Sequence, residues 1–585
     1  MLFRQSYIRL AFALVTLASA CKFSTNTAEL SVIQGIVTLQ DTTAPDSTWN
    51  SSPTLVLQIT AEPDNLHPTN GTSGQRSEIF GYIHRYLVTT NSASGLSPDL
   101  LQSLPAVSND GCTFKYRLRE GITWDNGEPV TAADVFFTCQ VNIAPQSLNP
   151  AYKSYWSNMK DFIPDPKDPL AFTLIMKQPH IQNVSFLSGF PILQRNFYDP
   201  GKLLQHLPLD QLSKDTTLHA WFELFNSDEF GRSAAKINGL GDYIVADWTP
   251  GISILLKRKK HEPGAPEQLL FKIAKDESSV ALELKKQVYD VTSYLSMTTF
   301  LQLASDPALC KNYHCVLSPT FNYSYLCFNT QPDSTHSQFF NNRDVREAIA
   351  HLISVDRIIE LLYQSTSNSA RRMTTNVSPF KNECDTTLVP IDYNLEKAKS
   401  LLNTSGWLDH DGDGVIDKKG IRMSMELLYL NTSADWKDMA GLITQELAKA
   451  GIEVEPIAVE QKIFLEKARN HNFDLLLGSW GGSSAPEDYA QLWSTASWTN
   501  HGSNYSGFGN TKTDSLIAEI NHSVNDTDRI NWSHLLQREI YHEQPYVFLY
   551  TSLRKTIIHK RWGHVRLFPD RPGMNVGEFR LIPRP

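Results

Sequence analysis

Residues 452–482 read IEVEPIAVEQKIFLEKARNHNFDLLLGSWGG, and this stretch decides the fold. Segment 452–459 has the composition of a strand, 462–469 has helical spacing, and 473–477 is nearly all apolar. A strand without polar alternation is typical of a parallel sheet that helices cover on both faces. We therefore predict a strand–helix–strand unit of an α/β lobe with right-handed connections.

The chain before this unit continues the alternation of helices and strands. Asp392 can cap a helix that carries Leu395 and Leu402, and Gly406 suits the left-handed end of that helix. The other expected elements are a strand over 54–59, a helix over 77–88, a helix over 345–353, a strand over 423–427 and a helix over 436–447 that stops before Gly451.

The loop after the apolar strand, GSWGGS at 478–483, is the best binding-site candidate on local grounds. Ligands of open α/β sheets bind beyond the carboxyl ends of the strands. Glycines let a ligand backbone approach closely, and Trp480 offers a flat apolar wall with one hydrogen-bond donor. A tight turn with a structural tryptophan would give the same pattern, so the local evidence leaves both interpretations open.

A second informative block is YRLREGITWDNGEPVTAADV at 116–135. Asp125 and Gly127 predict a turn, and Thr131 with Asp134 predicts a capping box that opens a helix. This block resembles the oligopeptide- and dipeptide-binding family of extracytoplasmic receptors for ATP-binding-cassette importers. Further blocks follow in the family's order: Leu66-His67-Pro68, 239–243, Phe328-Asn329, 345–348, 394–399 with Gly406-Trp407, Phe473-Asp474 with Trp480, and Glu543-Gln544-Pro545.

The resemblance implies a two-lobed α/β fold of the periplasmic-binding-protein type II class, which closes by a hinge, with an extra subdomain on the first lobe. The expected parts are a signal peptide over 1–20, a lipid-anchored tether over 21–53, a first lobe over 54–88, 190–321 and 551–585, an extra subdomain over 89–189, and a second lobe over 322–550.

The resemblance also implies how a peptide is held. An extended peptide presents backbone N–H and C=O groups that receptor backbone can pair, so affinity does not depend on side-chain identity. Carried over by position, the expected ligand contacts are Gln75, Tyr152, Tyr325, Asn329, Ser479, Trp480, Gly481, Gly482, Ser483 and Asp488.

This chain departs from the family at one of those positions. Peptide-binding members resemble Gly-Trp-x-x-Asp at the loop, where the Asp pairs with the ammonium of the ligand, and the matching residue here is Ser483. A hydroxyl supplies no Coulomb attraction to an ammonium. Either Glu487 or Asp488 replaces the missing carboxylate, or both are solvated acids at a helix start. The ligand is then a plain oligopeptide, a modified or cell-wall-derived peptide, or another small solute.

The N-terminus has the layout of a secretory signal. Arg4 and Arg9 precede a short apolar stretch over 10–17, and Ala18-Ser19-Ala20-Cys21 follows. Small residues before Cys21 resemble a bacterial lipoprotein processing site, so we expect Cys21 to carry the lipid that anchors the protein to a membrane. The alternative is a plain secretory signal with an incidental cysteine.

Composition and motifs exclude several classes of function. The net charge is −9, and phosphate binding needs clustered Lys and Arg, so we expect no nucleic-acid partner. The zinc-protease, nucleophile-elbow and phosphate-loop motifs are absent from the sequence, so we expect no catalytic residue and no cofactor. A peptidase or a chaperone-like protein on the same scaffold stays as the alternative class. We expect a monomer that works with the inner-membrane subunits of a permease.

Two local patterns bear on metals and disulfides. The acidic turn from Asp409 to Asp417 resembles a calcium loop, but Gly420 stands where the final Glu is needed, so we expect no metal. Export permits disulfides, and Cys310 and Cys315 are close enough in the chain for a local one.

Overall fold

The computed structural model describes residues 37–583 except 42–48, 72, 92–94, 149–155, 206, 213–217, 332–337, 365–369 and 524. The signal peptide expected over 1–20, the expected lipid attachment site Cys21 and the expected ligand contact Tyr152 lie outside this part of the chain. Within it, no helix is long and apolar enough to cross a membrane.

A ten-stranded sheet runs through the molecule in the order β17–β16–β18–β13–β19–β12–β2–β11–β10–β9. In that order, the strands are Glu453–Val459, Ser424–Leu430, Leu475–Trp480, Tyr313–Phe328, Tyr546–His559, Val291–Thr292, Thr54–Ile59, Gln268–Ile273, Ser253–Arg258 and Tyr243–Thr249. Strands β16 and β17 pair in parallel, and so do β16 and β18, as the apolar pattern of residues 473–477 predicted.

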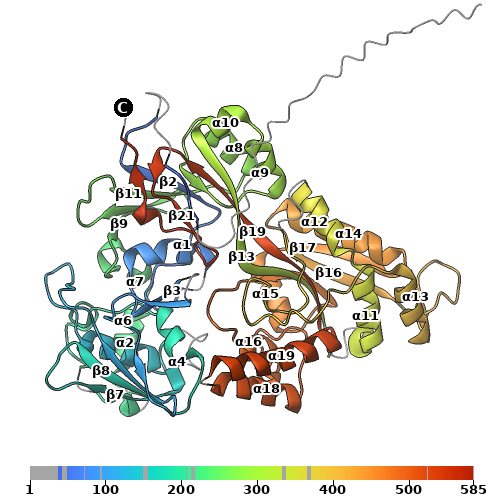
Figure 1. The fold of residues 1–585 in the computed structure, drawn as a ribbon, viewed down its shortest axis with the longest axis horizontal. Helices are drawn as coiled ribbons and strands as arrows, with labels where there is room; N and C mark the ends of the chain where they lie inside the picture. Colours follow the sequence, from blue (N-terminus) through green and yellow to red (C-terminus); the bar gives the residue numbers. More distant parts are fainter. Residues whose placement is uncertain are drawn as a thin grey trace, which may run out of the picture.

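Two long antiparallel strands, β13 and β19, join the two halves of this sheet (Figure 1). Their pairing loses its regular register between Pro319 and Tyr325, where the chain passes from one half to the other. We call the half with β2 and β9–β12 the first lobe and the half with β16–β18 the second lobe. The two-lobed fold is therefore as expected, and the domain boundaries at 321 and 550 fall within the two long strands and stay predictions.

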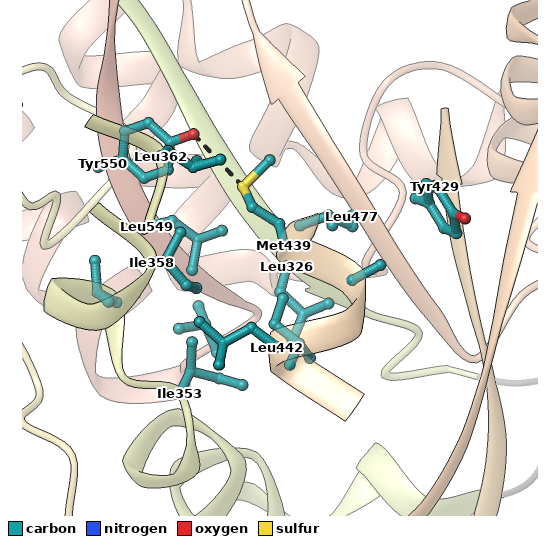
Figure 2. Packing of buried hydrophobic residues seen from close by; sticks show 14 of the residues in the cluster. Leu326, Ile353, Ile358, Leu362, Tyr429, Met439, Leu442, Leu477, Leu549 and Tyr550 are labelled. Carbon is teal, nitrogen blue, oxygen red and sulfur yellow. Dashed lines mark hydrogen bonds between the residues drawn. The ribbon is translucent and has the colours of Figure 1, made fainter. Parts of the chain in front are cut away.

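Helices cover both faces of the second lobe (Figure 1). One face packs on α11 (Arg343–Leu352), α12 (Val355–Tyr363), α13 (Leu395–Thr404) and α14 (Ala434–Ala448). The other packs on α15 (Gln461–Arg469), α16 (Tyr489–Trp493), α18 (Thr511–His522) and α19 (Asp526–Glu543), with α17 (Thr495–Thr499) beside them. Figure 2 shows the first of these two cores, where the Tyr550 hydroxyl lies 3.5 Å from the Met439 sulfur.

The remaining elements build the first lobe and the part of the chain beside it. Helices α1 (Gly74–Ile83), α8 (Glu277–Lys285), α9 (Met297–Ala304) and α10 (Pro307–Asn312) belong to the first lobe. A separate sheet, β5 (Ala106–Val107), β6 (Thr113–Arg117), β8 (Ala171–Met176) and β7 (Met159–Pro164), packs on α2 (Ala132–Ile143). Short helices α4 (Gln182–Ser185), α5 (Arg195–Tyr198), α6 (Leu218–Phe225) and α7 (Glu229–Arg232) follow. The pair β3 (Val88–Asn91) and β4 (Gly95–Pro98) lies here too, as do the two-residue strands β1 (Val37–Thr38), β20 (Trp562–Gly563), β21 (Arg566–Leu567) and β22 (Arg580–Leu581). In the second lobe, the short strands β14 (Asp417–Lys418) and β15 (Ile421–Arg422) pair between α13 and β16.

Local caps decided several element boundaries. The Thr131–Asp134 capping box opens α2 as predicted. Asp392 does not cap α13, because Asn394 is the cap and its side chain accepts the backbone N–H of Lys397. The helix expected over 77–88 begins earlier, at Gly74, because the side chain of Ser73 caps it, and it ends earlier, at Ile83, so that Val88 begins β3 instead.

His67 is a buried residue whose protonation state links stability to pH. Its Nδ1 accepts the backbone N–H groups of Thr69 and Asn70 at 3.1 and 3.2 Å, so Nε2 carries the proton and donates to the carbonyl of Phe225 at 2.5 Å. Burial lowers the pKa of His67 from 6.5 to about 4. His67 is therefore protonated near pH 6.5 in the unfolded chain but only near pH 4 in the folded chain.

We predict that His67→Gln makes the protein less sensitive to acid. The stability that neutral His67 contributes is complete above pH 6.5 and is lost as pH falls toward the folded pKa, by about 2 kcal/mol between pH 6.5 and pH 5. Urea unfolding of the wild type and the variant at these two pH values measures the difference. His219→Gln, which changes an exposed side chain, is the control. If wild type and His67→Gln lost the same free energy of unfolding between the two pH values, the lowered pKa of His67 would be contradicted.

Candidate functional site

The glycine-rich loop that follows β18 lies where the two long strands change register. Tyr323 pairs with Trp480 and Ser324 pairs with Ser479. The backbone N–H of Gly482 donates to the Asn322 side chain at 3.1 Å. Strand β18 thus places the loop at the junction of the two lobes. A ligand bound to one lobe at this position would contact the other lobe.

Aromatic rings support the loop from the second lobe. Trp480 stacks on Tyr325, with ring centroids 5.9 Å apart, and on Tyr505 at 5.3 Å. Tyr325 stacks in turn on Tyr546 at 4.5 Å. Because each ring is fixed by the next, Trp480 presents a defined surface to its surroundings.

A cavity of about 340 Å³ borders the loop, and we call it the Trp480 cavity. It is bordered by the loop and the start of α16 on one side and by residues near α4 on the other. The lining residues are Gln182, Ser185, Phe186, Gly189, Lys381, Trp480, Gly481, Gly482, Ser483, Ala485, Pro486, Glu487, Asp488, Gln491 and Leu492.

Three hydrogen bonds cross from the first lobe and the α4 region to the second lobe around this cavity. The Gln182 side chain donates to the carbonyl of Pro486 at 3.0 Å. The backbone N–H of Ile181 donates to the carbonyl of Asn521 at 2.8 Å. The backbone N–H of Ser484 donates to the Asp570 carboxylate at 2.7 Å. The cavity therefore lies between surfaces that are in contact, as in a closed arrangement of the lobes.

A second cavity, of about 650 Å³, borders helix α1. Its charged side chains largely pair with one another, as in Arg571 with Glu78 at 3.2 Å and Arg85 with Asp99 at 2.6 Å. It is larger than the Trp480 cavity, but none of its lining residues comes from the second lobe. We place the candidate site in the Trp480 cavity because residues from two parts of the fold meet there.

Charged groups in the Trp480 cavity are paired within the protein. The Lys381 ammonium donates to the carbonyl of Ala485 and to Glu487 Oε1, both at 2.6 Å. The side chain of Lys381 is 6% exposed. Glu383 lies 3.7 Å from the same ammonium and also pairs with Arg529. This ion-pair network lies directly beneath the loop.

The structure places half of the expected ligand contacts together. Trp480, Gly481, Gly482, Ser483 and Asp488 line the Trp480 cavity. Asp488 also caps α16, because its carboxylate accepts the N–H of Ala490 at 3.0 Å.

The other described candidates lie outside the lining of the cavity. Gln75 on α1 donates to the Thr60 hydroxyl at 3.3 Å. Asn329 is 1% exposed, and its amide donates to the carbonyls of His471 and Phe473. Tyr325 is buried beneath Trp480, and Ser479 is exposed at the edge of the loop. Their contact with a ligand stays a prediction.

Sequence reasoning missed Lys381, Gln182 and Phe186. Lys381 lies in an irregular segment without periodicity, and the other two come from a short helix far away in the chain. No local signal marks any of them, because only tertiary packing brings them to the loop.

Two other predictions concern thiols and carboxylates. Cys310 and Cys315 are free thiols here that hydrogen-bond to each other, and this contact lowers the pKa of Cys310 to about 7. The disulfide between them stays a prediction.

Asp409, Asp411 and Asp413 gather at an exposed turn, where Asp413 pairs with Arg422 and Asp409 accepts backbone N–H groups.

Comparisons with known proteins agree with this geometry. The family model described as bacterial extracellular solute-binding proteins, family 5 middle, matches residues 95–503. The oligopeptide-binding protein AppA of Bacillus subtilis (strain 168) is 23% identical over 533 residues, which cover 90% of this chain and 91% of AppA. The nickel-binding periplasmic protein of Escherichia coli (strain K12) is 22% identical over 74% of this chain and 76% of its own length. The structure of AppA from Bacillus subtilis in complex with a nonapeptide superposes with a TM-score of 0.73 at 20% identity, covering 90% of this chain and 98% of AppA.

Proposed function

Because the chain belongs to the family 5 bacterial extracellular solute-binding proteins, we propose that it captures oligopeptides outside the cytoplasm and delivers them to an ATP-binding-cassette permease. The observation that carries the proposal is the Trp480 cavity, which lies between the α4 region and the second lobe beside a glycine-rich loop at the end of a sheet strand. Members of this family are solute-binding proteins, and their ligands include peptides and nickel.

The proposed mechanism is closure around the ligand by bending of the two long strands. The irregular pairing between Pro319 and Tyr325 removes regular ladder hydrogen bonds at the junction, which makes this part of β13 the easiest to bend. In the open form the cavity would be accessible. On closure the ligand backbone would pair with the N–H and C=O groups of loop 480–483, while Trp480 packs against it.

The side chains of the cavity favour a peptide over a bare metal ion. Nickel is commonly bound by imidazole and thiolate ligands. The lining residues include neither His nor Cys. Across the described residues, the one group of three or more candidate ligands is the exposed turn at Asp409, Asp411 and Asp413, outside the cavity lining. Backbone groups, an indole and amide side chains instead match the groups of a peptide.

The anchor belongs to the same proposal. A lipid on Cys21 would keep the receptor at the membrane, with 21–53 as the tether between the lipid and the first lobe. Metabolic labelling with a palmitate analogue, compared between the wild type and Cys21→Ala, tests this part independently. Equal labelling of both proteins would exclude the anchor.

Ligand capture is tested on the mature protein prepared under mild conditions. We expect native mass spectrometry to detect co-purified peptides and calorimetry to record heat with a mixed oligopeptide pool. We also expect the radius of gyration from solution scattering to fall when the pool is added, because the lobes close. Absence of both binding and closure would refute the transport role, and cleavage of the peptides would favour the peptidase alternative.

A further inference from the structure

The Trp480 cavity contains its own cation. The ammonium of Lys381 donates two hydrogen bonds, to the carbonyl of Ala485 and to Glu487, both at 2.6 Å, and the Glu383 carboxylate lies 3.7 Å away at ion-pair distance. With its side chain 6% exposed, this lysine is buried, and its charge is compensated by protein groups.

The carboxylates near the loop are also engaged. Glu487 is paired with Lys381, and its backbone N–H donates to Glu383 at 3.2 Å. Glu383 is further held by Arg529. Asp488 is occupied as the cap of α16. The two acids that could replace the missing carboxylate at Ser483 are therefore both committed to partners within the second lobe.

These contacts decide which kind of ligand end the cavity accepts. A free ammonium entering beside Glu487 would compete with the Lys381 ammonium for the same carboxylate and would be repelled by that ammonium. In a partly desolvated site it would meet only the Asp488 carboxylate, which already accepts the N–H of Ala490. A carboxylate would be repelled by Glu487 and Asp488, while Lys381 already donates hydrogen bonds to Ala485 and Glu487 and has Glu383 as a further ion-pair partner. A neutral amide meets neither penalty and can exchange hydrogen bonds with the loop backbone and with Gln182.

We propose that Lys381 is a specificity-determining residue, and that its ion pair with Glu487 makes the cavity select peptides whose amino end is uncharged, such as acylated peptides. The inference rests on the proposed peptide-binding function and specifies its ligand class.

The test uses two peptide pools of the same sequences, one with free amino ends and one N-acetylated, titrated into the mature protein by calorimetry. We expect the wild type to bind the acetylated pool about 10-fold more tightly, because a neutral amide does not compete with Lys381 for the Glu487 carboxylate. In Lys381→Met the Glu487 carboxylate loses its partner, so the preference should move toward the free amino end. Lys397→Met, which removes a half-exposed surface ion pair with Glu347, should keep the wild-type preference.

A second variant tests the same inference in case Lys381→Met does not fold. Ser483→Asp adds a carboxylate to the lining while leaving the ion pair in place, and it should also move the preference toward free amino ends. Equal or tighter binding of the free-amine pool by the wild type would overturn the inference and leave the transport role intact. Failure of both pools to bind the wild type would refute the peptide-binding function and with it this inference.

Discussion

Replacing Arg561 with methionine is expected to lower the free energy of unfolding by about 3–5 kcal/mol, because it leaves a buried carboxylate without its partner. Arg561 and Asp290 are 5% and 3% exposed in their side chains and form two parallel contacts of 2.6 and 2.7 Å. The guanidinium also donates to the carbonyls of Asn50, Ser52 and Thr54. A single side chain thereby joins the segment before β2 to the end of β19.

The same carboxylate also organises the edge of the first lobe. Asp290 accepts the backbone N–H of Val56 at 2.8 Å, next to the parallel pairing of β2 and β12. Methionine would fill much of the volume of Arg561 but donates no hydrogen bond, so Asp290 and three carbonyls would lose their donor. We therefore expect the first lobe to be weakened more than the second.

Urea unfolding of Arg561→Met and wild type measures the loss, and hydrogen exchange of the β2 amides locates it. The control is Glu120→Ala, which removes a 2.9 Å pair with Arg117 whose acid is 75% exposed, and should cost less than about 1 kcal/mol. A loss below about 1 kcal/mol for Arg561→Met would contradict the structural role given to this pair.

Gly482→Ala is expected to weaken peptide binding by roughly 10- to 100-fold, because the loop at 480–483 has no room for a side chain at this position. A Cβ on Gly482 would lie 2.6 Å from the carbonyl oxygen of Phe321 and 2.9 Å from its Cβ. Phe321 lies in the irregular part of β13, so neither Phe321 nor the loop can move aside without changing the junction of the lobes. The loop would shift away from the position in which it contacts the ligand.

The neighbouring glycine gives a matched control. A Cβ on Gly481 would have its nearest neighbour, the Asn322 side chain, at 3.8 Å, which is an ordinary contact. Gly481→Ala should therefore bind the same peptide pool with nearly the affinity of the wild type. Calorimetry on both variants, with a thermal unfolding curve to show that each is folded, makes the comparison. Equal affinity of the two variants would exclude the proposed packing role of Gly482.

Local patterns were sufficient to predict a strand of the first lobe and much of the second lobe. The strand expected over 54–59 is β2 (Thr54–Ile59), and the strand–helix–strand unit over 452–477 matches β17, α15 and β18 within two residues at most boundaries. Periodicity and caps depend on side chains a few positions apart, so they can be predicted from the sequence. The cap predicted at Asp392 was wrong, because Asn394 caps α13.

In the candidate site, too, some residues could be predicted from local sequence patterns and others could not. The loop with Trp480 and Ser483 follows from an apolar strand and a glycine cluster, both local features. Lys381 pairs with Glu487, which lies 106 positions away, and Gln182 contacts Pro486 across 304 positions. Such contacts depend on how the lobes pack, and the composition of either segment does not encode them.

The sequence by itself determined the α/β elements and the glycine-rich loop at the end of β18, because each is a property of neighbouring residues. That Ser483 stands where an acid is expected follows from the resemblance to the peptide-binding family. Only the tertiary structure decided what surrounds that loop. Packing buried the Lys381 ammonium beside Glu487 and brought the Asp570 carboxylate to the N–H of Ser484. The charge of the cavity is the sum of groups distant in sequence, so it exists only in the folded chain.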